Sequence, residues 1–207
     1  MLRKVRKTTS RSAVTKDDNK VEAMFQGYQD PSGDTIGPEG VERLCQDLGV
    51  DPADRKVLIL AWKLGAQRMG YFSRAEFCSG CRDMKATDLT KLRAALPGLE
   101  DEVAMPSAFQ SFFQFAFRFC LTEPRQKIID VDTAVQMLQL TMPHEAHLPG
   151  FTQFLQDQTE YKSINQDQWT SFGRFAQEIR PDCSNYDESQ AWPLILDNFV
   201  EWCLNHK

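Results

Sequence analysis

The sequence predicts an all-α fold, a helical scaffold with no sizeable sheet. Apolar residues recur three and four positions apart along most of the chain, as they do on the buried face of a helix. Helix-start signals are frequent: Asp51-Pro52 joins an N-cap to a first-turn proline, and Ser73 precedes Glu76 by three residues in a capping box. Long alternations of Val, Ile and Thr between Asn-Gly turns, which indicate hairpins, do not occur in the sequence.

Residues 1–20 are expected to form a disordered basic tail, and residues 21–207 a helical domain. The tail holds seven Lys and Arg residues against two Asp residues and offers almost nothing apolar to bury. Its cluster Arg3–Lys7 is typical of a nuclear import signal or of non-specific polyanion binding, and we expect the protein in the nucleus and cytoplasm. Helices are expected over residues 21–28, 38–48, 53–66, 74–84, 88–96, 107–120, 131–141, 150–159, 166–179 and 193–204.

The charge of the chain is uneven. Because the whole chain carries −5 and residues 1–20 carry +5, the folded body carries −10. An acidic body does not suit DNA or RNA, whose phosphates require a basic surface, but it suits a basic protein partner. No apolar run approaches the length that spans a bilayer, so we expect no membrane contact. The six cysteines, in a chain without a secretory signal, are expected to be free thiols packed as small apolar residues.

Several helix–loop–helix units resemble EF-hands that have lost their metal. In the loop over residues 65–76, Gly70, Phe72 and Glu76 occupy the sixth, eighth and twelfth places of an EF-hand loop. The first, third and fifth places should supply oxygen ligands, but they hold Gly, Gln and Met. A hard cation needs about six oxygens, so this loop offers too few.

A second candidate EF-hand loop begins at Asp30 and has oxygen-bearing side chains at its first, third and fifth places. Its later places do not match the EF-hand pattern. Thr35 stands where the loop requires Gly, and Val41 stands at the twelfth place. We therefore expect degenerate EF-hand-like units that pack without an ion and need no cofactor. A calcium sensor or adaptor of the EF-hand type is the alternative function.

Two clusters of potential metal ligands do not have the spacing or the partner residues that a metal site requires. Cys78 and Cys81 form a C-x-x-C, but the sequence shows neither a second ligand pair for zinc nor a preceding strand for redox chemistry. A zinc-binding or thiol-reactive protein that uses this cysteine pair is a further alternative. The simpler interpretation is that both cysteines pack on one buried face of a helix. His144 and His147 are three residues apart, whereas a zinc protease helix requires four. With no catalytic constellation, we expect a protein that is not an enzyme.

Two predicted helices are apolar on more than one face. The helix over residues 107–120 has a clean aromatic stripe and leaves Phe115 and Phe119 on a second face. The helix over residues 53–66 has a similar surplus of apolar side chains. A helix with two apolar faces lies at the centre of a fold or lines a groove, and the pattern leaves both open.

The last predicted helix combines an anchored side with an acidic one. Pro193 suits its first turn, and Trp192 lies directly before it. The helical spacing buries one wide apolar stripe and leaves Asp197, Asn198 and Glu201 facing water. This acidic side is either a docking surface or a solvated helix face.

Three separated stretches resemble one family. Ser184–Trp202 resembles the signature near the C-terminus of the defective-in-cullin-neddylation family, within its potentiating-neddylation domain. Ile36–Gly40 with Leu58–Lys63, and Ile164–Trp169, resemble two further stretches of that family in the same order. The resemblance covers approximately residues 20–204. Residues 21–207 are thus expected to form this domain, in a short form that lacks the ubiquitin-binding module of some relatives.

The resemblance implies a non-catalytic scaffold, an accessory ligase that promotes cullin neddylation. It implies that Asp167, Ala191 and Asp197 bind the C-terminal winged-helix region of a cullin. It also implies an apolar pocket for the acetylated N-terminal methionine of the neddylation conjugating enzyme, whose rim differs from relatives at Met69 and Gly70. The implied pocket residues are Val41, Val57, Leu60, Ala61, Leu64, Phe72, Phe119 and Leu140.

Overall fold

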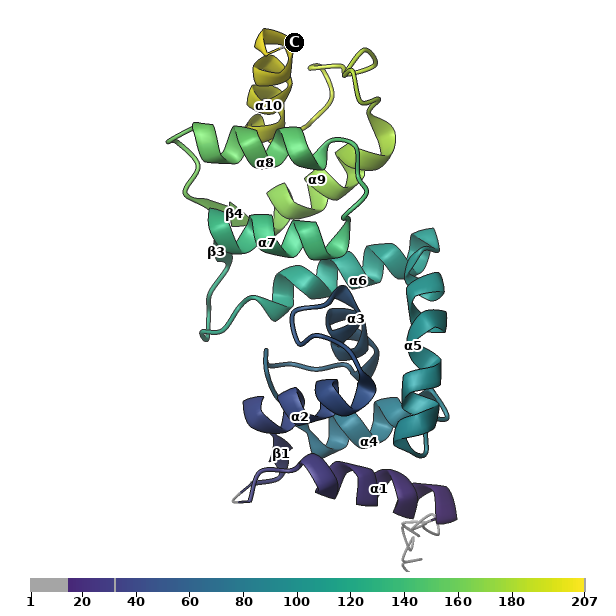
Figure 1. Ribbon diagram of the computed structural model, residues 1–207. Coiled ribbons are helices and arrows are strands. Elements are labelled where there is room, and N and C mark those ends of the chain that lie inside the picture. The colour runs from purple at the N-terminus through teal and green to yellow at the C-terminus, as the bar shows by residue number, and fades with distance from the viewer. Residues whose placement is uncertain (1–14, 32, 207) are drawn as a thin grey trace, which may run out of the picture.

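The protein is described here by a computed structural model, which covers residues 15–31 and 33–206. This part of the chain folds into ten α-helices and two sheets of two short strands each, which confirms the predicted fold class. The molecule is elongated, and the chain runs from the first helix at one end to the last helix at the other (Figure 1). Among the described residues, no helix is long and apolar enough to cross a membrane.

The N-terminal half consists of two helix–strand–helix units whose strands pair antiparallel, Thr35 with Ser73 and Ile36 with Phe72. The second unit begins helix α4 with the predicted capping box, since Ser73 and Glu76 each accept from the other's backbone N–H. The elements are α1 (Lys16–Tyr28), β1 (Thr35–Ile36), α2 (Pro38–Leu48), α3 (Arg55–Leu64), β2 (Phe72–Ser73) and α4 (Arg74–Asp83).

The C-terminal half repeats this arrangement. Its strands pair with Ile129 opposite Ile164, and the cap residues Asp130 and Asn165 begin the helices that follow each strand. Helix α5 joins the two halves, and α10 closes the far end of the molecule (Figure 1). The elements are α5 (Leu89–Val103), α6 (Pro106–Phe119), β3 (Ile128–Asp130), α7 (Val131–Thr141), α8 (Leu148–Asp157), β4 (Ser163–Asn165), α9 (Gln166–Glu178) and α10 (Leu194–Asn205).

Three predicted helix boundaries are wrong. Asp51 and Pro52 do not begin α3, because the Asp54 side chain caps that helix and it starts at Arg55. Helix α1 begins at Lys16 rather than at residue 21, because Thr15 and Asp18 form a capping box, so residues 16–20 of the expected tail are helical. The cluster Arg3–Lys7 lies outside the described residues. Helix α5 was expected to stop before Pro97, but it continues to Val103 because Leu99 and Val103 extend its buried stripe. Packing of that stripe outweighs the backbone hydrogen bond that proline removes.

The strand pairing also shows which residues hold the EF-hand-like places of the first loop, the one that follows α1. Phe72 is the eighth residue of the loop over residues 65–76, so its partner Ile36 holds the eighth place of the first loop. That loop therefore begins at Gln29 rather than Asp30, and its twelfth place is Gly40. The carbonyl oxygen of Tyr28 would lie 2.2 Å from a Cβ at Gly40, so this place has no room for a ligating side chain.

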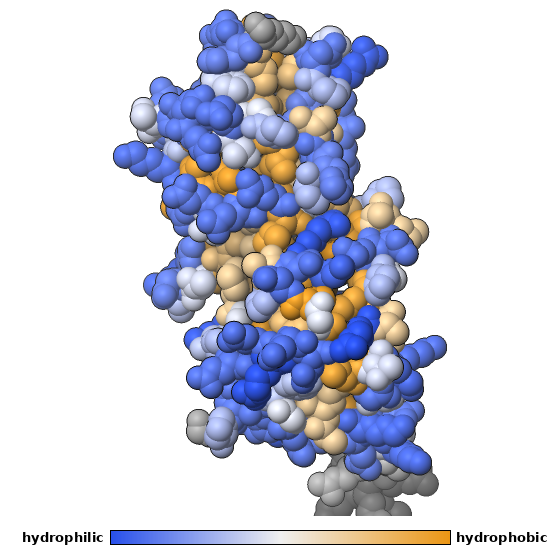
Figure 2. Space-filling model, in the orientation of Figure 1, coloured by the Kyte–Doolittle hydropathy of each residue, from blue (hydrophilic) through white to orange (hydrophobic). Residues whose placement is uncertain are grey.

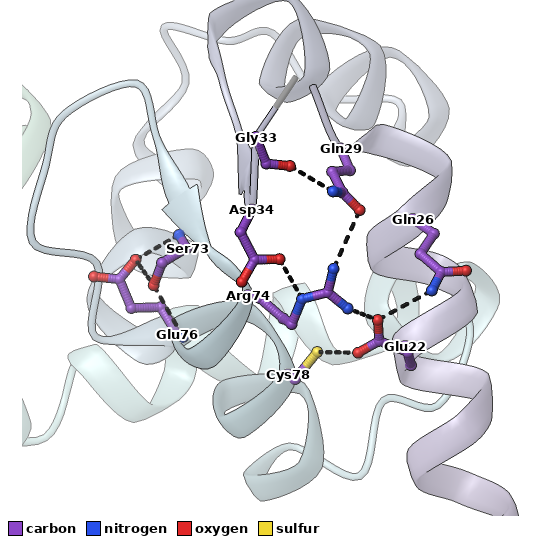
Figure 3. A network of polar contacts seen from close by, with 9 residues as sticks. All are labelled: Glu22, Gln26, Gln29, Gly33, Asp34, Ser73, Arg74, Glu76 and Cys78. Carbon is purple, nitrogen blue, oxygen red and sulfur yellow. Dashed lines mark hydrogen bonds and ion pairs between the residues drawn. The ribbon is translucent and has the colours of Figure 1, made fainter. Parts of the chain in front are cut away.

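A cationic side chain joins the first helix to the paired loops. The Arg74 guanidinium forms ion pairs with Glu22 of α1 and Asp34 of the first loop, and it donates to Gln29 (Figure 3). In the second loop, the oxygens of Glu76 accept from the backbone N–H groups of Gln67 and Ser73. The acidic groups that an ion would require are thus engaged within the protein, which weighs against the calcium-sensor alternative.

Helix α6 lies at the centre of the fold. Six of its side chains are buried, including the two that the sequence left outside its main stripe. It packs against α3 and α5 on one side and against α7 and α9 on the other. The surplus apolar face of α6 is therefore explained mainly by its central position. The buried side chains are Phe112, Phe113, Phe115, Ala116, Phe117 and Phe119.

We predict that Gly80→Ala destabilises the protein by about 1–3 kcal/mol, because overpacking would force α3 and α4 apart. A Cβ at Gly80 would lie 2.7 Å from Leu64 Cα and 3.3 Å from Lys63 O. The matched control is Gly98→Ala in α5, where nothing lies within 4 Å of the added Cβ and the helix gains propensity. Urea unfolding measures both, and equal stability of the two variants would contradict the close approach.

Candidate functional site

A largely apolar pocket of about 470 Å³ opens where the two halves of the protein meet. Helices α2 and α3 and the loop before β2 line it from the N-terminal half, and α6 and α7 line it from the C-terminal half. Apolar side chains also reach the surface near the middle of the molecule in the view of Figure 2. The lining residues are Pro38, Val41, Glu42, Pro52, Ala53, Val57, Leu58, Ala61, Met69, Gly70, Phe72, Phe119, Met137 and Leu140.

Six of the eight residues expected in a pocket line this one. They come from four separate helices and one strand, so the fold brings together side chains that are up to a hundred positions apart. The other two, Leu60 and Leu64, lie in the core with exposed fractions of 2% and 4% and do not belong to the lining. The six lining residues are Val41, Val57, Ala61, Phe72, Phe119 and Leu140.

The sequence did not reveal several of the lining residues. Pro52 and Ala53 belong to the turn before α3 and resembled only a helix start. Met137 resembled an ordinary core position of α7, and it lines the pocket because α7 packs across the end of α6. Glu42 is the single charged residue of the lining, and nothing in its spacing marked it. Met69 and Gly70 lie in the lining, as expected for rim residues.

Such a pocket suits a neutral, apolar side chain better than a charged group. Burial of a methionine- or leucine-sized side chain contributes about 1.5–3 kcal/mol, whereas burial of an unpaired charge is strongly unfavourable. Val41, Val57 and Leu140 are half-buried, so they present apolar surface to the opening while the fold holds them in place. The pocket therefore has the character of a binding site for an apolar group.

The three residues expected in an acidic patch occupy two elements of the C-terminal half. Asp167 is exposed in the first turn of α9, and Asp197 is half-buried in the first turn of α10. Ala191 is exposed just before α10. In the described part of the chain, no hydrogen bond or ion pair joins Asp167 to the other two. Packing of Arg174 of α9 over the ring of Trp192, 3.9 Å from its centroid, holds the two elements against each other.

Two polar side chains on the acidic side of α10 form hydrogen bonds within the protein, which the helical spacing did not predict. Asp197 and Asn198 were expected to face water, but the Tyr186 hydroxyl donates to Asp197 and Asn198 donates to the Tyr161 hydroxyl at 2.7 Å. Glu201 remains exposed, as expected. The loop before α10 folds back along the helix, which places Tyr186 beside the Asp197 carboxylate. Periodicity could not reveal this contact because it depends on the path of the loop.

Comparison of the sequence with known proteins shows which family the chain resembles. A sequence profile described as cullin binding matches residues 91–202. DCN1-like protein 2 of Dictyostelium discoideum is 41% identical over 84% of this chain and 65% of its own length. DCN1-like protein 4 of Homo sapiens is 43% identical over 82% of this chain and 58% of its own length. DCN1-like protein 5 of Mus musculus is 37% identical over 87% of this chain and 75% of its own length.

The chain belongs to the DCN1-like, cullin-binding family. This is the family that the three sequence stretches resembled, and the resemblance is confirmed. The chain spans less than two thirds of the length of the Dictyostelium and human relatives. The family profile includes α6 to α9 and most of α5 and α10, and the matches to the relatives extend over the N-terminal half as well.

Three of the four side chains in the remaining ligand-like clusters of this DCN1-like chain are buried, and His144 is exposed. Cys78 and Cys81 are buried in α4, and burial is the main cause that raises the pKa of the Cys81 thiol to about 12. His147 is buried, and its ring nitrogen lies 2.9 Å from the carbonyl oxygen of Ile179. In the described part of the chain, no group of three or more His, Cys, Asp or Glu side chains could hold a metal ion.

We predict that Tyr186→Phe costs about 1 kcal/mol of stability at neutral pH, because the Asp197 carboxylate loses a hydrogen-bond donor. Burial first, and then the contact with Asp197, raise the pKa of Tyr186 above its usual value. The protonated hydroxyl therefore stabilises the native state below pH ~10, and this contribution disappears as the pH rises through the higher native pKa.

Urea unfolding of both proteins from pH 7 to pH 11 measures this effect. The stability difference between the wild type and Tyr186→Phe should stay constant to about pH 9.5 and shrink above it. The other tyrosines titrate in both proteins, so their contribution cancels. A difference that does not change across this range would show that the hydroxyl forms no such bond in solution.

Proposed function

We propose that the protein is a non-catalytic scaffold for cullin neddylation, which binds a cullin and a neddylation conjugating enzyme together. The observation that carries this proposal is the apolar pocket between the two halves, in a chain whose family is described as cullin binding. The pocket provides one binding site, and the acidic residues at the ends of α9 and α10 provide a second, separate one.

The acidic patch formed by Asp167, Ala191 and Asp197 is proposed to bind the C-terminal winged-helix region of the cullin. The small side chain of Ala191 leaves space for a basic side chain of the partner to approach the carboxylates. Because Asp197 accepts from Tyr186, its carboxylate has a fixed orientation before the partner arrives. A fixed acceptor loses less conformational entropy on binding than a mobile one.

The pocket is proposed to bind the acetylated N-terminus of the conjugating enzyme. A free amino terminus is charged, and its burial among apolar side chains would be unfavourable. Acetylation removes this charge and leaves an amide that requires only hydrogen bonds. The methionine side chain then contributes about 1.5–3 kcal/mol of apolar burial. The pocket should therefore discriminate between acetylated and unmodified chain ends.

Binding both partners at once would accelerate transfer without any catalytic side chain. When the conjugating enzyme and the cullin are held on one rigid scaffold, attack of the cullin lysine on the thioester becomes nearly intramolecular. Favourable orientation of two reactants can supply several kcal/mol of the activation barrier. In this proposal, the contribution of the protein is geometric.

We predict that Asp167→Lys weakens binding of a cullin C-terminal domain on the order of tenfold, because it places a positive charge against a basic partner. Asp132→Lys is the matched control, since both aspartates are exposed second residues of their helices. Isothermal titration calorimetry measures both variants. Equal affinity of the two variants would contradict the proposed role of Asp167.

We predict that Leu140→Arg lowers affinity for an acetyl-methionine peptide more than tenfold, because the half-buried Leu140 lines the pocket and the new charge would occupy it. Leu89→Arg is the control, a half-buried leucine at the start of α5 that lies outside the lining. Fluorescence anisotropy with acetylated and free-amine peptides gives both affinities. Equal binding of the two peptides by the wild type would exclude the pocket mechanism.

A reconstituted cullin modification assay tests the proposed function as a whole. The wild-type chain should raise the rate of modifier transfer to the cullin, and Asp167→Lys and Leu140→Arg should each reduce that stimulation. The two control variants should stimulate like the wild type. A transfer rate that is the same with and without the chain would overturn the proposal.

A further inference from the structure

The pocket lining has a single charged side chain, and the described residues provide it with no hydrogen-bond or ion-pair partner. Glu42 projects from α2 and lines the pocket, while the other thirteen lining residues are uncharged. Glu42 is exposed, and among the described residues no hydrogen bond or ion pair involves its carboxylate. Its neighbour Arg43 donates instead to the carbonyl oxygen of Tyr28, on the side of α2 that faces α1.

A second carboxylate neighbours the pocket lining in the sequence. Asp51 directly precedes the lining residue Pro52. Burial raises the pKa of the nearby Cys45 thiol, and both Asp51 and Glu42 add to this effect. None of the described lining residues is basic. The pocket therefore has an apolar interior and, on the side formed by α2, one acidic side chain in its lining.

We propose that the pocket selects peptides in which a basic residue closely follows the apolar first residue, because that basic side chain pairs with Glu42. This inference rests on the proposed function, in which a chain end enters the pocket. Consecutive residues of an extended chain lie about 3.3–3.6 Å apart, so the second to fourth residues leave the pocket across its rim. A Lys or Arg side chain at one of these positions can reach the Glu42 carboxylate, whereas an acidic one is repelled.

The size of the effect follows from the exposure of Glu42. An ion pair between solvent-exposed side chains is weak and is screened by salt, so we expect a two- to fivefold preference for a basic over a neutral residue. Apolar burial of the first residue would supply most of the affinity, and Glu42 would supply selectivity among chain ends that share that first residue.

The test uses the full chain and a set of acetyl-methionine peptides that carry Lys, Gln or Glu at position two, three or four. Fluorescence anisotropy at low salt should show that Lys binds two to five times more tightly than Gln at one of these positions, and that Glu binds more weakly. The preference should vanish in Glu42→Gln and reverse in Glu42→Lys. In 0.5 M salt, it should shrink in the wild type.

Glu39→Gln is the matched control, because Glu39 is an exposed glutamate of the same helix that does not line the pocket. This variant should keep the wild-type preference. Equal affinities for Lys, Gln and Glu peptides in the wild type, or the same preference in wild type and Glu42→Gln, would overturn the inference and leave the pocket function intact. Failure of every acetylated peptide to bind would overturn the proposed function as well.

Discussion

The burial of α6 on nearly all of its sides is the constraint on which the rest of the structure depends. On one side, the ring of Phe112 lies 5.9 Å from that of Trp62 in α3. On another side, Phe113 stacks on Trp169 of α9 at 4.6 Å, and the indole N–H of Trp169 donates to the carbonyl oxygen of Phe113. One helix thus holds together both halves of the molecule.

This arrangement also determines where a pocket can form. Phe119 lies at the end of α6, where the helix no longer fills the space between α3 and α7. The opening left there is lined from both halves, so its shape depends on how they are held against α6. The acidic residues of α9 and α10 lie in the C-terminal half, away from that opening. The two proposed binding surfaces thus differ in chemistry and lie on different elements of the molecule.

The sequence predicted most of the fold because its signals are local. All ten helices follow from apolar spacing and from caps such as Ser73 and Asn165. The errors occur where tertiary packing decides: α5 continues through Pro97, and strand pairing shifts the first loop by one residue. At the site, the resemblance to a family supplied most of the pocket, but Glu42 and the bond from Tyr186 to Asp197 required the folded chain.

The capping role of Glu76 has a consequence for how such a loop can change over evolution. Its carboxylate accepts from Ser73 and Gln67, and in an ion-binding loop that same carboxylate would be a bidentate ligand. Restoring oxygen ligands at the start of the loop would therefore not regenerate an ion site by itself, because helix initiation and ion coordination would compete for one side chain. A glutamate at the twelfth place of such a loop is thus no sign of ion binding when it caps the helix that follows.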